Sequence, residues 1–84
     1  MNQDLKDLIE TFADDPMIMD GYDDCIIGVI ERFGQTNHVV YDYDLVIKKL
    51  MSEGMTEEEA SEWYNFNMLG SYVGESTPAF IHKL

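Results

Sequence analysis

Carboxylates are the most abundant groups in this sequence that could do chemistry, and one run of them invites comparison with a calcium-binding loop. Asp20, Asp24 and Glu31 stand at positions 1, 5 and 12 of the EF-hand pattern. Tyr22 occupies position 3, where the pattern has an oxygen ligand, and Cys25 occupies position 6, where it has glycine. The run therefore does not predict a calcium site, and capping of a helix explains its acids better.

Other catalytic and metal-binding patterns are missing from the sequence. Neither His38 nor His82 has a carboxylate three positions before it, as the Glu-x-x-His pairs of di-iron bundles require. The glycines around Ser71 stand at the wrong offsets for a G-x-S-x-G elbow, and no phosphate-binding glycine loop is present. The single cysteine, Cys25, is expected to be a small buried apolar group. We therefore expect a protein that is not an enzyme and that needs no metal or other cofactor.

The charge balance is the most unusual property of the chain. Five Lys and Arg stand against 17 Asp and Glu, which gives a net charge of −12 at pH 7. Direct binding to nucleic acid or to an anionic membrane requires clustered basic residues, so neither is an expected partner. The balance favours solubility, a cation, or a partner protein with a basic surface, including a surface that normally holds nucleic acid.

The acids concentrate in the second half of the chain. Between Leu50 and Ile81 there is no Lys or Arg, and Glu58 and Glu62 stand four residues apart without a basic neighbour. Such a like-charge pair mildly destabilises a helix, so local stability does not explain it. A solvated face and an acidic binding surface both stay open as explanations. For a binding surface, the candidate partner-binding residues are Asp23, Asp24, Asp42, Asp44, Glu53, Glu57, Glu58 and Glu62.

The length and composition predict a single domain, residues 1–84. The 45% hydrophobic content is typical of a chain that folds, and a core of this size cannot be divided in two. So small a core also leaves a homodimer open as a source of stability. The N-terminal segment is amphipathic, and no apolar run approaches the ~20 residues that span a bilayer, so we expect a cytoplasmic protein.

Two helices are expected in the first half of the chain. The first begins at Asn2 as N-cap and ends near Ala13, with an apolar stripe formed by Leu5, Leu8, Ile9 and Phe12. The second begins at Asp20 as N-cap and ends at Gly34, with an apolar stripe formed by Tyr22, Ile26, Val29, Ile30 and Phe33.

The middle of the chain predicts a strand followed by two more helices. Residues 38–41 are β-branched and aromatic, which favours a short strand. Asp42 or Asp44 can cap a third helix that ends at Gly54. Thr56 then opens a fourth helix, which we expect to end near Gly70 and to form the centre of the core.

The start of this fourth helix carries the clearest local signal in the sequence. Thr56 and Glu59 form the S/T-x-x-E capping box. Farther along, Trp63 and Tyr64 have helical spacing and are expected in the core, although the apolar residues of this helix cover a wide arc.

The end of the chain predicts a loop and a last strand. Gly74 and Pro78 punctuate the loop, and residues 79–81 are expected to form a strand beside residues 38–41. The sequence therefore predicts an α-rich α+β fold, with about four short helices packed on a minor two-stranded β element.

Four segments resemble a group of small acidic proteins encoded by tailed bacteriophages, mostly of unassigned function. The segments are DGYDDCIIGVIERFG, VVYDYD, EGMTEEEASEWYNFN and GSYVGESTPAFI, which together cover roughly residues 20–81. The resemblance implies an accessory phage protein that acts in the host cytoplasm, and it transfers no site residue to this chain. Small acidic phage proteins include anti-restriction and anti-CRISPR inhibitors that imitate the charge of DNA.

Two functions are therefore expected from the sequence. The first is a non-enzymatic inhibitor whose acidic surface binds a host protein, such as a nucleic-acid-binding defence component. The alternative is a small structural or assembly module that self-associates through its apolar surface.

Overall fold

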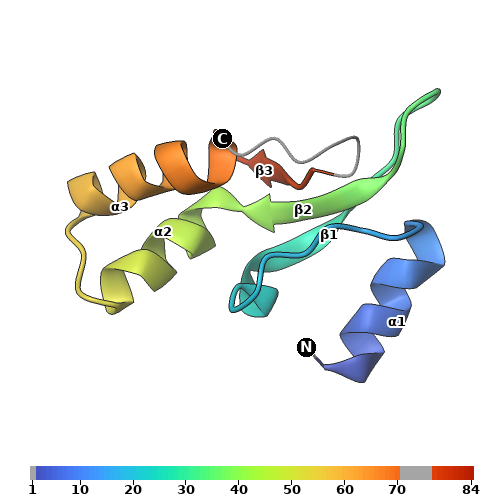
Figure 1. The fold of residues 1–84 in the computed structure, drawn as a ribbon, viewed down its shortest axis with the longest axis horizontal. Helices are drawn as coiled ribbons and strands as arrows, with labels where there is room; N and C mark the ends of the chain where they lie inside the picture. The colour runs from blue at the N-terminus through green and yellow to red at the C-terminus, as the bar shows by residue number, and fades with distance from the viewer. Residues whose placement is uncertain (1, 71–76) are drawn as a thin grey trace.

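A small mixed sheet carries helices at both of its ends in the computed structural model, which describes residues 2–70 and 77–84 (Figure 1). The helices α2 and α3 lie side by side at one end, whereas α1 lies beside β1 at the other. Strand β2 is central, with β1 antiparallel on one side and β3 parallel on the other. The elements are α1 (Gln3–Phe12), β1 (Ile26–Ile30), β2 (His38–Asp42), α2 (Tyr43–Ser52), α3 (Glu57–Tyr64) and β3 (Ala79–Ile81).

The prediction of four helices and a two-stranded element is wrong, although the fold is α+β. Within the described residues the structure has three α-helices and a three-stranded sheet. The error lies in the segment from Asp20 to Gly34, where a helix was expected. A short 3₁₀ turn, Asp23–Cys25, precedes β1 there, and its N-cap is Tyr22 instead of Asp20.

The residue types of β1 explain why this segment is a strand. Ile26, Ile27, Val29 and Ile30 are β-branched and lose side-chain freedom in a helix, and Gly28 weakens a helix further. Apolar spacing over so short a run fits both structures, so pairing with β2 decides between them. Gly34 has a φ of 76° in the hairpin loop, the left-handed conformation that was expected at a helix end.

Local capping signals placed the other helices correctly. The Asn2 side chain accepts hydrogen bonds from the N–H groups of Asp4 and Leu5, and α1 ends at Phe12 with Ala13 as its C-cap, near the predicted end. Asp42 is the cap of α2, and Gly54 follows that helix with a φ of 105°. The strand predicted at residues 79–81 is also confirmed, beside β2.

The capping box of α3 is present as predicted. The Thr56 hydroxyl accepts from the N–H of Glu59 at 3.2 Å, and the Glu59 carboxylate accepts from the N–H of Thr56 at 2.9 Å. Replacing Thr56 by Ala leaves one of these N–H groups unpaired, so we expect the free energy of unfolding to fall by about 1 kcal/mol. Urea denaturation followed by circular dichroism measures this loss, and an unchanged midpoint would contradict a role for the cap.

The centre of the core lies in β2 and α2, so its expected place in the fourth helix is wrong. Val39 and Tyr41 of β2 and Val46 of α2 are completely buried. Helix α3 contributes Ala60 and Tyr64 and then continues into a π-helical turn, Asn65–Leu69. The π-helical turn ends before Gly70, close to the expected helix end.

Two further sequence expectations concern the segment around residues 71–76 and the crossing of a membrane. Ser71 and the loop at Gly74 lie outside the described residues. None of the helices in residues 2–70 and 77–84 is long and apolar enough to cross a bilayer.

Candidate partner-binding surface

The eight acids predicted to bind a partner do not form one surface, and Asp42 is the clearest exception. Its side chain caps α2 by accepting from the N–H groups of Asp44 and Leu45, at 2.9 and 3.4 Å. Its second oxygen lies 2.9 Å from the Lys83 ammonium group, and the residue is 2% exposed. Lys83 holds the pKa of Asp42 below its ordinary value, helped by the N–H groups of Leu45 and Asp44. Asp42 is therefore engaged as a helix cap and as an ion-pair partner, which leaves little of its carboxylate for the predicted partner contact.

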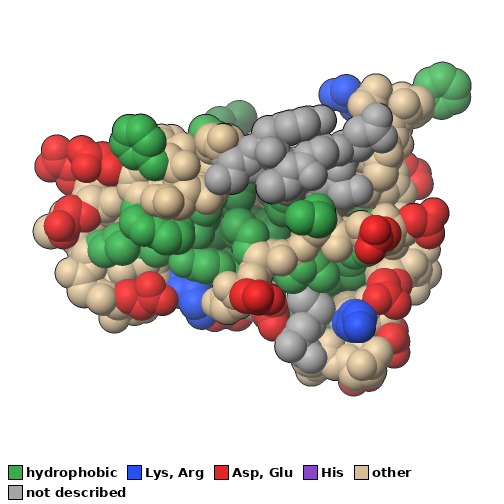
Figure 2. Space-filling view, viewed as in Figure 1, with side chains coloured by type: hydrophobic (Ala, Val, Ile, Leu, Met, Phe, Trp, Pro, Cys, Tyr) green, Lys and Arg blue, Asp and Glu red, His purple; other side chains and the backbone are tan. Residues whose placement is uncertain are grey.

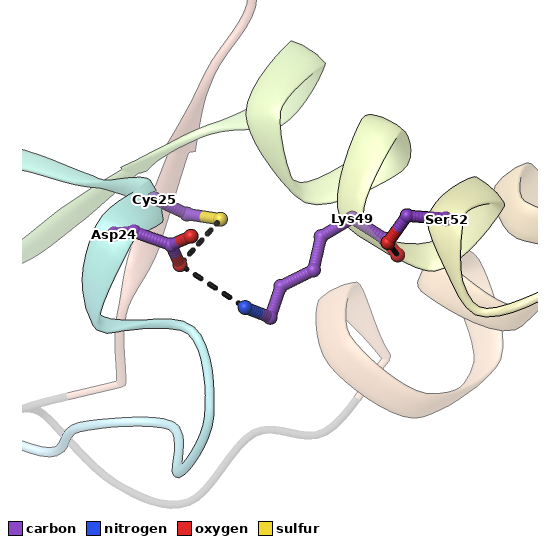
Figure 3. A network of polar contacts seen from close by, with 4 residues as sticks. All are labelled: Asp24, Cys25, Lys49 and Ser52. Atoms are coloured by element: carbon purple, nitrogen blue, oxygen red, sulfur yellow. Dashed lines mark hydrogen bonds and ion pairs between the residues drawn. The ribbon is translucent and has the colours of Figure 1, made fainter.

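Asp24 is also engaged within the molecule. Figure 3 shows Lys49 extending from α2 to Asp24, where its ammonium nitrogen lies 3.3 Å from the carboxylate. The same carboxylate oxygen lies 3.8 Å from the Cys25 sulfur. The hydrogen bond from Lys49 lowers the pKa of Asp24. This ion pair links the start of β1 to α2, which leaves Asp24 less suited to bind a basic partner.

Cys25 has the environment of an unreactive thiol. It is buried in the hydrophobic core, and burial together with the charge of Asp24 raises the pKa of its thiol to about 11. The thiolate, which is the nucleophilic form, is therefore scarce at neutral pH.

Asp23 and Asp44 lie near these two ion pairs, at different levels of exposure. Asp23 is half-buried in the 3₁₀ turn, and Asp44 is exposed in the first turn of α2. Negative charge in a first helical turn is stabilised by the unpaired N–H groups there, so a structural role accounts for Asp44 as well.

The four remaining predicted acids are exposed around the turn from α2 to α3. Glu53 follows α2, and Glu57, Glu58 and Glu62 belong to α3. Figure 2 shows acidic side chains gathered at the end of the molecule where α3 begins. Within residues 2–70 and 77–84, no ion pair is recorded for any of the four. Structural interactions therefore leave these carboxylates available to a partner.

Helix geometry brings two of these acids together with aromatic side chains. At about 100° per residue, Glu58 and Glu62 project from the side of α3 opposite Ala60 and Tyr64, and Trp63 lies on the flank between Glu62 and Ala60. Phe66, in the π-helical turn, is 82% exposed and extends the aromatic surface beyond them. We call Glu58, Glu62, Trp63 and Phe66 the α3 face. Glu57 lies about 100° around the helix from Glu58, so it borders this face.

Sequence reasoning missed the aromatic half of the α3 face. Trp63 was expected in the core, but it is partly exposed, and only its neighbour Tyr64 is buried. The wide arc of apolar residues on this helix was the available signal, because a helix packed on one side can bury only part of such an arc.

The hydroxyl of Tyr64 is a buried polar group without a hydrogen-bond partner among the described residues. Its ring packs edge-on against Tyr43 and Phe80, at the contact between α3, the start of α2 and β3.

The described side chains do not gather into a metal site. Within residues 2–70 and 77–84, no group of three His, Cys, Asp or Glu is arranged to hold a metal ion.

Comparison with known proteins adds no identification to this geometry. No protein-family model, curated protein or solved structure matches the chain.

Proposed function

We propose that the chain is a non-enzymatic, phage-encoded inhibitor that acts in the host cytoplasm by binding a basic surface of a host protein. The observation that carries this proposal is the α3 face, where two carboxylates that form no ion pair with any described residue stand beside two exposed aromatic rings. The net charge of −12 favours the same kind of partner over any acidic one.

The two kinds of side chain have different tasks in this proposal. Trp63 and Phe66 supply the apolar area that anchors an interface, since aromatic residues dominate binding hot spots. Glu58 and Glu62 supply charge that selects Lys and Arg on the partner and accelerates the encounter. A basic groove built for phosphates offers such Lys and Arg clusters. The proposed target is accordingly a nucleic-acid-binding defence protein, inhibited in the manner of anti-CRISPR or anti-restriction proteins.

The double variant Glu58→Gln/Glu62→Gln tests the charged part of the α3 face. Gln keeps the size and helix propensity of Glu and removes the charge, so we expect the fold to be retained and one like-charge contact in α3 to be relieved. The binding partner is first captured from host lysate and identified. We then expect its affinity for the variant to be about tenfold lower, from up to about 1 kcal/mol for each charge at the rim.

The variant Asp14→Asn/Asp15→Asn is the matched control. It removes two charges from exposed positions after α1, and Asn tolerates the positive φ of 46° at residue 15. We expect this control to keep the affinity within about twofold of the parent, apart from a small effect of net charge. Equal losses in both variants would show that total charge, and not the α3 face, drives binding.

A further inference from the structure

An apolar groove lies between α1 and β1. Figure 1 shows α1 at the opposite end of the molecule from α3. The volume of the groove is about 320 Å³, at the lower end of the range for small-molecule pockets. Leu8 is 59% exposed here although it belongs to the apolar stripe of α1, and Ile27 and Phe12 are similarly exposed. The lining residues are Leu5, Leu8, Ile9 and Phe12 of α1 and Ile26, Ile27, Gly28 and Val29 of β1.

The strand that forms one wall of this groove is an edge of the sheet. In the described part of the chain, β1 pairs only with β2, so alternate residues of β1 direct N–H and C=O groups away from the sheet. A register shift between Ile26 and Gly28 leaves Ile27 without a cross-strand partner. Such a bulge limits edge pairing to the regular part of the strand, from Gly28 to Ile30.

Charge decides which occupant suits the groove. Asp4 and Asp7 are exposed on α1, and both lie on the same side of Leu8 around the helix. Figure 2 shows several acidic side chains around α1. A second copy of this chain would bring the same acids and another net charge of −12 to the contact, which opposes self-association. A basic segment experiences the opposite effect.

We propose that the groove binds an extended segment of a partner protein in which apolar residues alternate with Lys or Arg. The segment adds a strand to the outer edge of β1 at Gly28–Ile30. Its apolar side chains enter the groove against Leu8, Phe12 and Ile27. Because successive side chains of a strand point to opposite faces, its basic side chains point away from the groove into solvent, where the net charge of −12 favours them. This site is separate from the α3 face, so either can fail without the other.

Two short synthetic peptides of identical composition serve as probes. One alternates Val with Lys, and the other holds the same residues in one block of Val and one block of Lys, so that only the first presents an alternating strand. We expect the alternating peptide to bind about tenfold more tightly, because only its strand places all Val side chains on one face. Both peptides carry the same charge, so attraction by charge alone would give equal affinities. Hydrogen exchange measured by NMR should show slower exchange of outward N–H groups in Gly28–Ile30 when that peptide is bound.

Two variants with the same charge change locate the binding. Leu8→Lys places a cation in the groove, whereas Phe66→Lys places one on the α3 face, and both positions are exposed enough to accept Lys. We expect the first to weaken binding of the alternating peptide about tenfold and the second to change it less than about twofold. If Leu8→Lys does not fold, Ile27→Lys replaces it, because Ile27 is also half-exposed.

Several results would overturn the proposal. Equal affinity for the two peptides would mean that charge alone attracts them, and equal losses in the two variants would place binding elsewhere. A dimer that protects Gly28–Ile30 without peptide would show that a second copy fills the groove. Absence of binding by the alternating peptide at low salt would likewise exclude the proposed occupant.

Discussion

Replacing Leu50 by Ala is expected to lower the free energy of unfolding by about 3 kcal/mol, within the range for a buried leucine. Leu50 is 1% exposed, and it belongs to the cluster that also contains Val39, Tyr41 and Tyr64. The truncation removes apolar contacts and leaves a cavity between α2, α3 and the sheet. Domains of this length have total stabilities of only about 4–13 kcal/mol, so the variant should be partly unfolded at moderate temperature.

Leu45→Ala is the control for this prediction, because it makes the same change in the same helix. Leu45 is 37% exposed, so we expect a loss of less than about 1 kcal/mol. Urea denaturation followed by circular dichroism gives both values. Equal losses for the two variants would mean that α2 packs on the sheet with a different face from the one described.

The parts of the fold that sequence reasoning predicted are those that nearby residues determine. Asn2, Asp42 and Thr56 each cap a helix through N–H groups two or three positions ahead, so their effect is visible in the sequence. The segment of β1 carries no such signal. Its apolar spacing fits a helix as well as a strand, and the choice depends on pairing with β2, beyond a seven-residue connection.

The candidate site was only partly predictable for a related reason. A list of acids cannot show which of them meet a cation, since Lys49 and Lys83 reach Asp24 and Asp42 only after folding. What distinguishes Glu58 and Glu62 is the lack of such a cation within the described residues and the presence of Trp63 and Phe66 beside them. The exposure of these rings depends on which side of α3 the sheet and α2 cover, and that follows from tertiary packing.

Replacing the buried Asp42 is expected to have the largest effect on stability of any change to a charged residue in this protein. Asp42→Ala removes both the cap of α2 and the ion pair that ties Lys83, just after β3, to the end of β2. Asp42→Asn keeps an oxygen that caps the helix and removes only the charge. We therefore expect the urea midpoint to fall more in Asp42→Ala than in Thr56→Ala, which loses a cap alone, with Asp42→Asn between Asp42→Ala and the parent.

Lys83→Met is the matched control, because it removes the same ion pair from its exposed partner. If the ion pair carries the charge-dependent part of the stability, then Asp42→Asn and Lys83→Met should lower the midpoint by similar amounts, and the two changes together should not add. Additive losses would indicate that Asp42 and Lys83 act independently.

The pH dependence of the same variants tests the role of the Asp42 carboxylate. Lys83 and the N–H groups at the start of α2 lower the pKa of Asp42 from its ordinary value of 3.8, so the folded state binds this proton less readily than the unfolded state. The resulting stability is complete above about pH 4 and is lost as the pH falls through the folded-state pKa. Acidification also relieves repulsion among the other carboxylates, but it does so in parent and variant alike. The difference in free energy of unfolding between the parent and Asp42→Asn should therefore stay constant from about pH 7 to pH 5 and shrink as the pH falls below about 4, whereas a difference that is constant throughout would mean that Asp42 has the same proton affinity folded and unfolded.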